Sequence, residues 1–229
     1  METIEGVTAM TVIFVIATIL IFLGIDWFTQ RSRATHAVAA ALAHKPMPVR
    51  ARTPEGIFFT PSHTWLNLFP SGKVRLGMDD FITRMLDNPE IVFLKQPGDT
   101  VHKGDPLLQC KEDGHTLTVR SPIDGDILDT NHELTAHPEY MKNMLFSQGW
   151  AYTLKPQRFT DLKQLLLGTE THVWMQREFG RLRDFFAAAA QGSGLAPAFL
   201  QDGGPPVANA MKSMTDEVWK QFESDFLTP

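Results

Sequence analysis

The stretch from residue 91 to residue 125 constrains the fold most, because it joins short strand-like runs through dense Gly and Pro punctuation. Residues 107–111 and 115–120 have the composition of strands, and the triplet Glu-Asp-Gly at 112–114 separates them. Asp-Gly between two such runs is typical of a tight hairpin, because the turn needs positive φ angles that Gly adopts without strain. The sequence therefore predicts a β-hairpin with its tip at residues 112–114.

Other strand-like runs surround this hairpin and predict a compact, mainly β domain of the sandwich or barrel type. They lie at residues 57–59, 61–68, 73–77, 91–94, 125–128 and 150–154. A short helix is expected at residues 79–86, where Asp79 and Asp80 place negative charge at the helix start. This role explains the two carboxylates better than an acid/base pair does.

The C-terminal part is expected to be helical, over residues 158–190 and again over residues 208–227, with a Gly- and Pro-rich loop between the two helices. The second helix places an apolar stripe on one side, at steps of three and four residues. Its members are Met211, Met214, Val218, Phe222 and Phe226. Such a stripe packs either on the chain's own domain or on a partner subunit, and the sequence leaves both possibilities open.

Near the N-terminus, residues 7–25 form an uncharged apolar run. As a helix this run is long enough to cross a hydrocarbon core of about 30 Å. The acidic residues before it and the missing small-residue cleavage site argue against a signal peptide. Basic residues follow the run, so the positive-inside rule predicts a single-pass anchor with the C-terminal domain in the cytoplasm, at the inner (plasma) membrane.

These observations divide the chain into four parts: an N-terminal transmembrane helix at 1–30, a stalk and linker at 31–55, the β-domain at 56–156 and a C-terminal helical extension at 157–229. The net charge of −5 and the absence of a Lys/Arg cluster argue against a nucleic-acid partner. The single cysteine, Cys110, has no Cys-x-x-Cys partner and is interpreted as structural.

No catalytic residue is predicted, and the chain is not expected to be an enzyme. The histidines include no pair at a metal-binding helical spacing such as H-x-x-x-H, so no metal site is expected. His63 is interpreted as a fold residue beside Trp65. The Gly192-Ser193-Gly194 triplet lacks the strand–turn–helix context of a nucleophile elbow.

Several short motifs stand in order across residues 58–156. They are His63-Thr64-Trp65, Gly77-Met78-Asp79-Asp80-Phe81, Pro97-Gly98-Asp99, Lys103-Gly104-Asp105, Ser121-Pro122 and Gly149-Trp150. In this order they resemble the H-x-W, G-I-T-D-Y and later motifs of the glycine cleavage system H-protein family, in the lipoyl-domain superfamily. The resemblance implies a barrel-sandwich hybrid fold with C-terminal additions.

The resemblance also implies what stands at the hairpin tip. Members of that family carry a lipoylated lysine there, in an E-S-V-K-A motif, and it shuttles an aminomethyl group between enzymes. Counting back seven residues from Ser121 places the lysine position on Gly114 and the glutamate position on Lys111. A glycine offers no amine to acylate, so no lipoyl or other cofactor is expected. Lys111 is the alternative acceptor, because it is the only lysine near the tip.

The favoured hypothesis is a non-catalytic, membrane-anchored subunit that stabilises a respiratory or other electron-transfer complex. Its expected partners are integral membrane subunits, together with membrane lipid along residues 7–25. Partner contacts are expected at Glu112 and Asp113, whose substitution should weaken assembly and leave domain stability nearly unchanged, and at Met211, Val218 and Phe222. One alternative is a lipoylated one-carbon, acyl or electron shuttle that uses Lys111. Another is an adaptor for lipoylated proteins or for a lipoate-handling enzyme.

Overall fold

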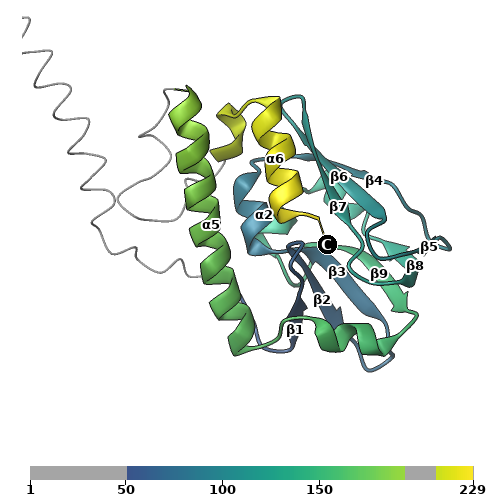
Figure 1. Ribbon diagram of the computed structural model, residues 1–229. Coiled ribbons are helices and arrows are strands. Elements are labelled where there is room, and N and C mark those ends of the chain that lie inside the picture. Colours follow the sequence, from purple (N-terminus) through teal and green to yellow (C-terminus); the bar gives the residue numbers. More distant parts are fainter. Residues whose placement is uncertain (1–50, 194–209, 229) are drawn as a thin grey trace, which may run out of the picture. The chain divides into compact units, whose positions relative to one another are not determined.

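A computed structural model describes residues 51–193 and 210–228 (Figure 1). Contacts divide the chain between Met47 and Pro48, and every element described below belongs to the unit Pro48–Pro229. The predicted span at residues 7–25 and the predicted stalk lie outside the described residues. Among the helices in the described ranges, none combines the length and the apolar character needed to span a membrane.

Two antiparallel sheets build the β-domain. The larger sheet has the order β1-β2-β3-β9-β8-β5, with β1 at Ile57–Phe59, β2 at Thr64–Leu68, β3 at Val74–Met78, β9 at Trp150–Pro156, β8 at Gly125–Thr130 and β5 at Thr100–Val101. The smaller sheet has the order β4-β6-β7, with β4 at Glu90–Phe93, β6 at Pro106–Glu112 and β7 at His115–Arg120. In the smaller sheet, β4 and β7 are therefore the outer strands.

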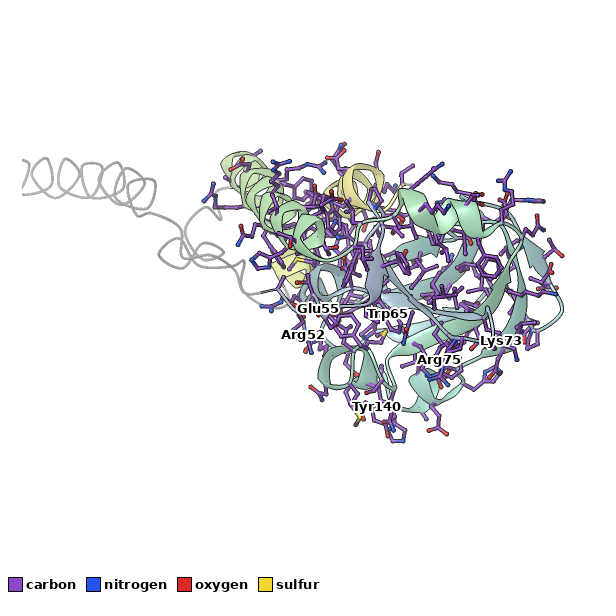
Figure 2. The ribbon with its side chains drawn as sticks, turned by 90° about the horizontal axis from the view of Figure 1, so that it is seen from below. Arg52, Glu55, Trp65, Lys73, Arg75 and Tyr140 are labelled. Carbon is purple, nitrogen blue, oxygen red and sulfur yellow. The ribbon has the colours of Figure 1, made fainter. Side chains whose placement is uncertain are left out.

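Alternating apolar residues of both sheets fill the core, as expected for strands buried on one face. Trp65 of β2 is completely buried and lies inside the β-domain in Figure 2. Its ring fits because residue 77 is a glycine: a Cβ atom added at Gly77 would lie 2.6 Å from a ring carbon of Trp65. The Gly in the Gly77-Met78-Asp79 motif is therefore explained by packing against the Trp of the His63-Thr64-Trp65 motif.

The helical elements are, in chain order, α2 at Asp80–Met85, α3 at Glu133–Ala136, α4 at Tyr140–Asn143, the 3₁₀ helix η1 at Phe159–Gln164, α5 at Thr169–Ser193, the 3₁₀ helix η2 at Ala210–Ser213 and α6 at Asp216–Phe226. Figure 1 shows α2, α5 and α6 together at one side of the sheets. Aromatic contacts join them: the ring centroids of Phe81 and Phe179 lie 5.3 Å apart, and those of Phe185 and Phe222 lie 6.0 Å apart.

The prediction of a mainly β domain with C-terminal helices is confirmed, with several local differences. The helix predicted at 208–227 is divided into η2 at Ala210–Ser213 and α6 at Asp216–Phe226, because Thr215 between them has extended backbone. β5 is only two residues long, which is too short to leave a periodic pattern in the sequence. The predicted helix at 158–190 instead begins as η1, and α5 starts only at Thr169. Between them, Leu166 pairs with Phe59 through two backbone hydrogen bonds of 2.9 Å and covers the outer edge of β1. This pairing requires extended backbone, which interrupts the helix.

Candidate functional site

The hairpin tip is a two-residue loop between β6 and β7, as the sequence predicts. Glu112 pairs with His115, and Asp113 and Gly114 form the loop with φ angles of 50° and 84°. Positive φ at both central residues is the signature of a type I′ turn, the turn that matches the twist of a hairpin. The Asp-Gly pair therefore accounts for this loop by itself.

Gly114 is exposed, and a Cβ atom built on it would meet no atom within 4 Å. The position counted as the family's lysine position therefore projects into open space. The four residues at the tip, 112–115, are Glu, Asp, Gly and His, so none of them carries an amine. The tip is exposed, and its side chains offer no amine for amide formation.

Lys111 does not replace that lysine at the tip. It lies within β6, the central strand of the smaller sheet, where it pairs with Glu90 of β4 and with Thr116 of β7. Its side chain is exposed. Cys110 before it is buried, so the alternation along the strand directs Lys111 to the outer face of the sheet. An acceptor there would stand on a flat sheet face.

Glu112 fastens the tip to the loop between α2 and β4. Its carboxylate accepts hydrogen bonds from the backbone N–H of Asp87, at 2.8 and 3.0 Å, and from that of Asn88, at 2.9 Å. The sequence gives no sign of this role, because the partners are 24 and 25 residues away. The Glu112 side chain therefore already accepts hydrogen bonds within its own chain. The hypothesis that it contacts a partner subunit stays a prediction.

On its other side the tip contacts the C-terminal helices. His115 Nδ1 lies 2.8 Å from Asp216 Oδ1, and its ring stacks on Trp219 with centroids 4.8 Å apart and planes inclined by 9°. Asp113 faces Lys212 Nζ at 3.8 Å. The partner role of Asp113 likewise stays a prediction.

The apolar stripe packs largely within the chain, while the predicted partner contacts at Met211, Val218 and Phe222 stay a prediction. Met211 and Phe222 are completely buried within the chain, and Val218 is half-buried. The indole Nε1 of Trp219 donates to the carbonyl of Met211 at 3.0 Å, which holds η2 against α6. Of the two possibilities left open by the sequence, intramolecular packing is therefore the one realised for Met211 and Phe222, because the β-domain and α5 supply the apolar surface.

Cys110 is completely buried, and its Sγ lies 3.5 Å from Met78 Sδ. Burial, with a smaller contribution from the charge of Glu112, raises the pKa of the thiol to about 12. Because the thiolate is the reactive form of cysteine, this residue is inert at neutral pH. The structural interpretation made from the sequence agrees with this geometry.

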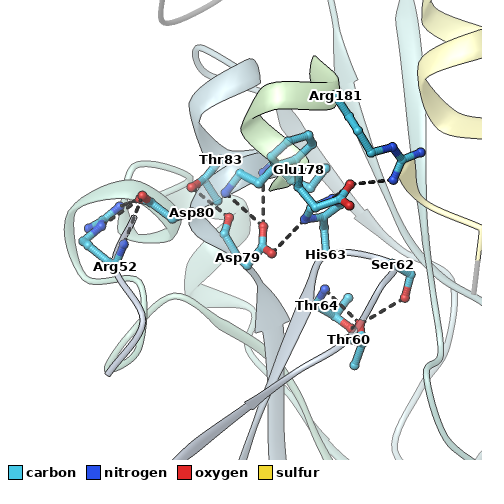
Figure 3. A network of polar contacts seen from close by, with 12 residues as sticks. Arg52, Thr60, Ser62, His63, Thr64, Asp79, Asp80, Thr83, Glu178 and Arg181 are labelled. Carbon is cyan, nitrogen blue, oxygen red and sulfur yellow. Dashed lines mark hydrogen bonds and ion pairs between the residues drawn. The ribbon is translucent and has the colours of Figure 1, made fainter. Parts of the chain in front are cut away.

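A buried ionic cluster lies where the β1–β2 turn, α2 and α5 meet (Figure 3). His63 is completely buried at a φ of 57°; its Nδ1 donates to Asp79 Oδ2 at 2.9 Å, and its Nε2 lies 3.7 Å from Glu178 Oε2. Asp79 also caps α2, since its Oδ1 accepts from the N–H of Phe81 at 2.9 Å. The His63 ring stacks on Phe81 at 3.8 Å between centroids.

The two carboxylates favour the charged form of the imidazole. Burial by itself lowers the pKa of His63, but the charge and hydrogen bond of Asp79 and the proximity of Glu178 outweigh it, so the pKa is raised from 6.5. For Glu178, burial by itself raises the pKa of the carboxyl group. The hydrogen bonds and charges of His63 and Arg181 outweigh this effect, and the pKa of Glu178 is lowered. Arg181 Nη1 donates to Glu178 Oε2 at 2.7 Å. The cluster therefore joins α5 to the β-domain electrostatically.

A second buried carboxylate stands beside it. Asp80 is completely buried; it accepts from Arg52 Nη2 at 2.6 Å and from Arg84 Nη2 at 2.7 Å. Arg52 also donates to the carbonyl of Lys142 at 2.6 Å. The prediction that Asp79 and Asp80 belong to a helix start is confirmed, but their partners come from segments that local sequence does not identify. Among the described residues, no group of three or more His, Cys, Asp or Glu side chains is placed to hold a metal ion.

Comparison with known proteins gives one consistent family. Residues 57–178, just over half of the chain, match the profile described as Glycine cleavage H-protein. A probable glycine cleavage system H protein of Pyrococcus furiosus is 28% identical over 113 residues, covering 49% of this chain and 84% of that protein. The glycine cleavage system H protein of Psychrobacter sp. is 28% identical over 120 residues, covering 52% and 95%. The crystal structure of a Mycobacterium marinum H protein matches with a TM-score of 0.46 and 21% identity, over 53% of this chain and 97% of that one.

Proposed function

The chain belongs to the glycine cleavage H-protein family, and we propose that it is a non-catalytic subunit that uses the family's fold to stabilise a membrane protein complex, without carrying a lipoyl group. Family membership confirms the resemblance seen in the sequence. Members of the family are carriers rather than enzymes, in agreement with a non-catalytic role. The membrane complex and the missing lipoyl group are the parts that go beyond family membership.

The hairpin tip carries this proposal. A lipoyl arm needs a lysine amine at an exposed tip, and the exposed tip position here is Gly114. Lys111, the alternative acceptor, stands between two neighbouring strands on the sheet face. A family member that keeps the fold and lacks this amine can still bind other proteins through the surface of the domain, but it cannot carry a lipoyl group at the tip.

The membrane part of the proposal comes from the sequence. Residues 7–25 anchor the chain in the inner membrane with its C-terminal domain in the cytoplasm. A shuttle must reach several enzymes, so a tether opposes that role, whereas a fixed subunit benefits from one. The partners are integral membrane subunits of a respiratory or other electron-transfer assembly.

Intact-mass measurement of the chain, purified from cells that make lipoylated proteins, tests the missing lipoyl group. We expect the mass calculated from the sequence. A lipoyl adduct that maps to Lys111 would instead establish the carrier alternative and overturn the proposal.

Gentle detergent extraction from native membranes, followed by identification of co-purifying subunits, tests the complex. We expect the chain to elute with integral membrane proteins in a fixed ratio. Elution of the chain alone as a monodisperse species, or its recovery in the soluble fraction, would contradict the role as a complex subunit.

A further inference from the structure

The C-terminal segment, which comprises residues 210–228, occupies the free edge of β7. β7 is an outer strand of the smaller sheet. The N–H of Thr118 points away from β6 and donates to Glu223 Oε2 of α6 at 3.3 Å. A free strand edge is an open template for docking by another chain. In this chain α6 lies along that edge and takes up a donor that another protein would otherwise bind.

The contacts follow the edge in order from the loop onward. The contacting pairs are Asp113–Lys212, His115–Asp216, His115–Trp219 and Thr118–Glu223. Residue numbers rise together on both sides, so the C-terminal segment runs beside this edge from the loop to Thr118. Figure 1 shows α6 beside the end of the smaller sheet that carries this loop.

Apolar packing holds the C-terminal segment in place. Trp219 is 3% exposed and Phe222 is completely buried. Phe226 lies against Phe81 of α2, with ring centroids 5.3 Å apart. The segment is therefore a part of the core, and loss of its exposed ion pairs alone would not release it.

We propose that the C-terminal segment blocks the β7 side of the exposed hairpin tip to enzymes that transfer acyl groups to lysine, so that a lysine restored at position 114 is poorly acylated. This inference rests on the proposed function, because it takes the tip to be the former attachment point. An enzyme that approached the tip from the β7 side would meet α6, because Asp216 and Trp219 contact His115, the residue next to Gly114.

The probe is lipoylation of Gly114→Lys in the full chain, co-expressed with a lipoate ligase and supplied with lipoate. In this reaction the lysine Nζ attacks the carbonyl of lipoyl-adenylate, the bond to the phosphate oxygen breaks, AMP leaves and Nζ releases a proton. The added side chain meets no atom within 4 Å, and a thermal melt verifies that the variant tolerates the positive φ. A lipoyl domain expressed in the same cells shows that the ligase is active.

A second variant opens the edge: Gly114→Lys combined with Asp216→Ala, Trp219→Ala and Glu223→Ala. It removes both groups on His115 and the acceptor of the Thr118 amide, and it keeps Phe222 and Phe226. Hydrogen exchange at the Thr118 amide verifies the opening. The matched control combines Gly114→Lys with Lys220→Ala and Gln221→Ala, two exposed positions of the same helix. Gly114→Lys combined with Asp216→Ala and Glu223→Ala, which keeps the buried Trp219, replaces the opened variant if that variant does not fold.

We expect at least tenfold more adduct by intact mass on the opened variant than on Gly114→Lys or on the matched control. Two results would overturn the inference: an adduct on Gly114→Lys as complete as on the lipoyl domain, or no adduct on a folded variant whose edge is open. Either result leaves the proposed function intact. An adduct on Lys111 of the unsubstituted chain would overturn the proposed function instead.

Discussion

α5 and α6 are fastened to the β-domain by polar contacts of opposite kinds. α5 is joined through His63, Asp79 and Glu178, where His63 and Asp79 are completely buried and Glu178 is nearly so. α6 and the preceding η2 are joined through pairs at the surface, in which the side chains of Asp216 of α6 and Lys212 of η2 are 71% and 55% exposed. Water screens the second set, while the first set has lost its hydration and depends on its partners. Removal of a charge from the buried set is therefore expected to lower the free energy of unfolding far more than removal of a charge from the exposed set.

Removal of Asp79 is expected to have the largest effect. Asp79→Ala takes the charge partner from buried His63 and also removes the cap of α2. Breaking a buried pair in this way costs about 3–5 kcal/mol. Urea denaturation of the detergent-solubilised chain measures it. Asp79→Asn is the matched control: it keeps a capping oxygen and should lose less. Because Asp79→Asn also lacks the charge, a negligible loss for this variant would show that the charge does not matter and would remove the contrast between the two sets.

The pH dependence of stability follows from the same cluster. The pKa of His63 is raised from 6.5, so its contribution is complete below pH 6.5 and is lost as the pH rises through the pKa of the folded state. Glu178 has a lowered pKa, so its contribution is present above pH 4.5 and is lost as the pH falls through its folded-state pKa. We expect the unfolding free energy to decline above pH 6.5, by no more than about 1.4 kcal/mol per pH unit for one proton.

His63→Asn tests the assignment of that decline. Asn tolerates the positive φ of this position better than most residues do. The variant should be less stable throughout, and its stability should no longer fall between pH 6.5 and 8. An unchanged slope in that range would assign the titration to another group.

Glu112 is expected to have an intermediate effect. Glu112→Ala removes the acceptor of the Asp87 and Asn88 amides, and hydrogen bonds to a charged group contribute about 1.5–3 kcal/mol each when buried and less at a partly exposed site. We expect a loss of about 1 kcal/mol by urea denaturation. This differs from the expectation from the sequence that substitution of Glu112 and Asp113 leaves the stability of the domain nearly unchanged. Glu112→Gln, which retains an acceptor, should lose less than Glu112→Ala.

The smallest effect is expected at the surface pair. Lys212→Ala removes the ion pair with Asp113 at 3.8 Å, and exposed pairs of this kind contribute about 0.2–1 kcal/mol. The thermal midpoint should move little, and the remaining shift should vanish at 1 M salt, where charges are screened within about 3 Å. A loss as large as that of Asp79→Ala would show that exposure does not separate the two sets.

Local sequence accounts for the strands other than β5, for the hairpin and for the start of α2, because each is decided by neighbouring residues. Asp-Gly specifies the type I′ loop, and Asp79 caps the helix that begins at the next residue. Sequence similarity carries the family assignment over residues 57–178. The length of the uncharged apolar run at residues 7–25 and the charges on either side of it indicate a membrane anchor, which stays a prediction.

Only the tertiary structure decided what surrounds the tip and the buried histidine. His63 meets Asp79 across 16 residues and meets Glu178 on α5, far along the chain. The burial of Met211 and Phe222 likewise depends on surfaces supplied by other elements, which an apolar stripe cannot identify. The sequence by itself determined that the tip carries Gly114 and no amine. The fold determined that α6 covers the strand edge beside it, because the energy of that placement comes from long-range packing.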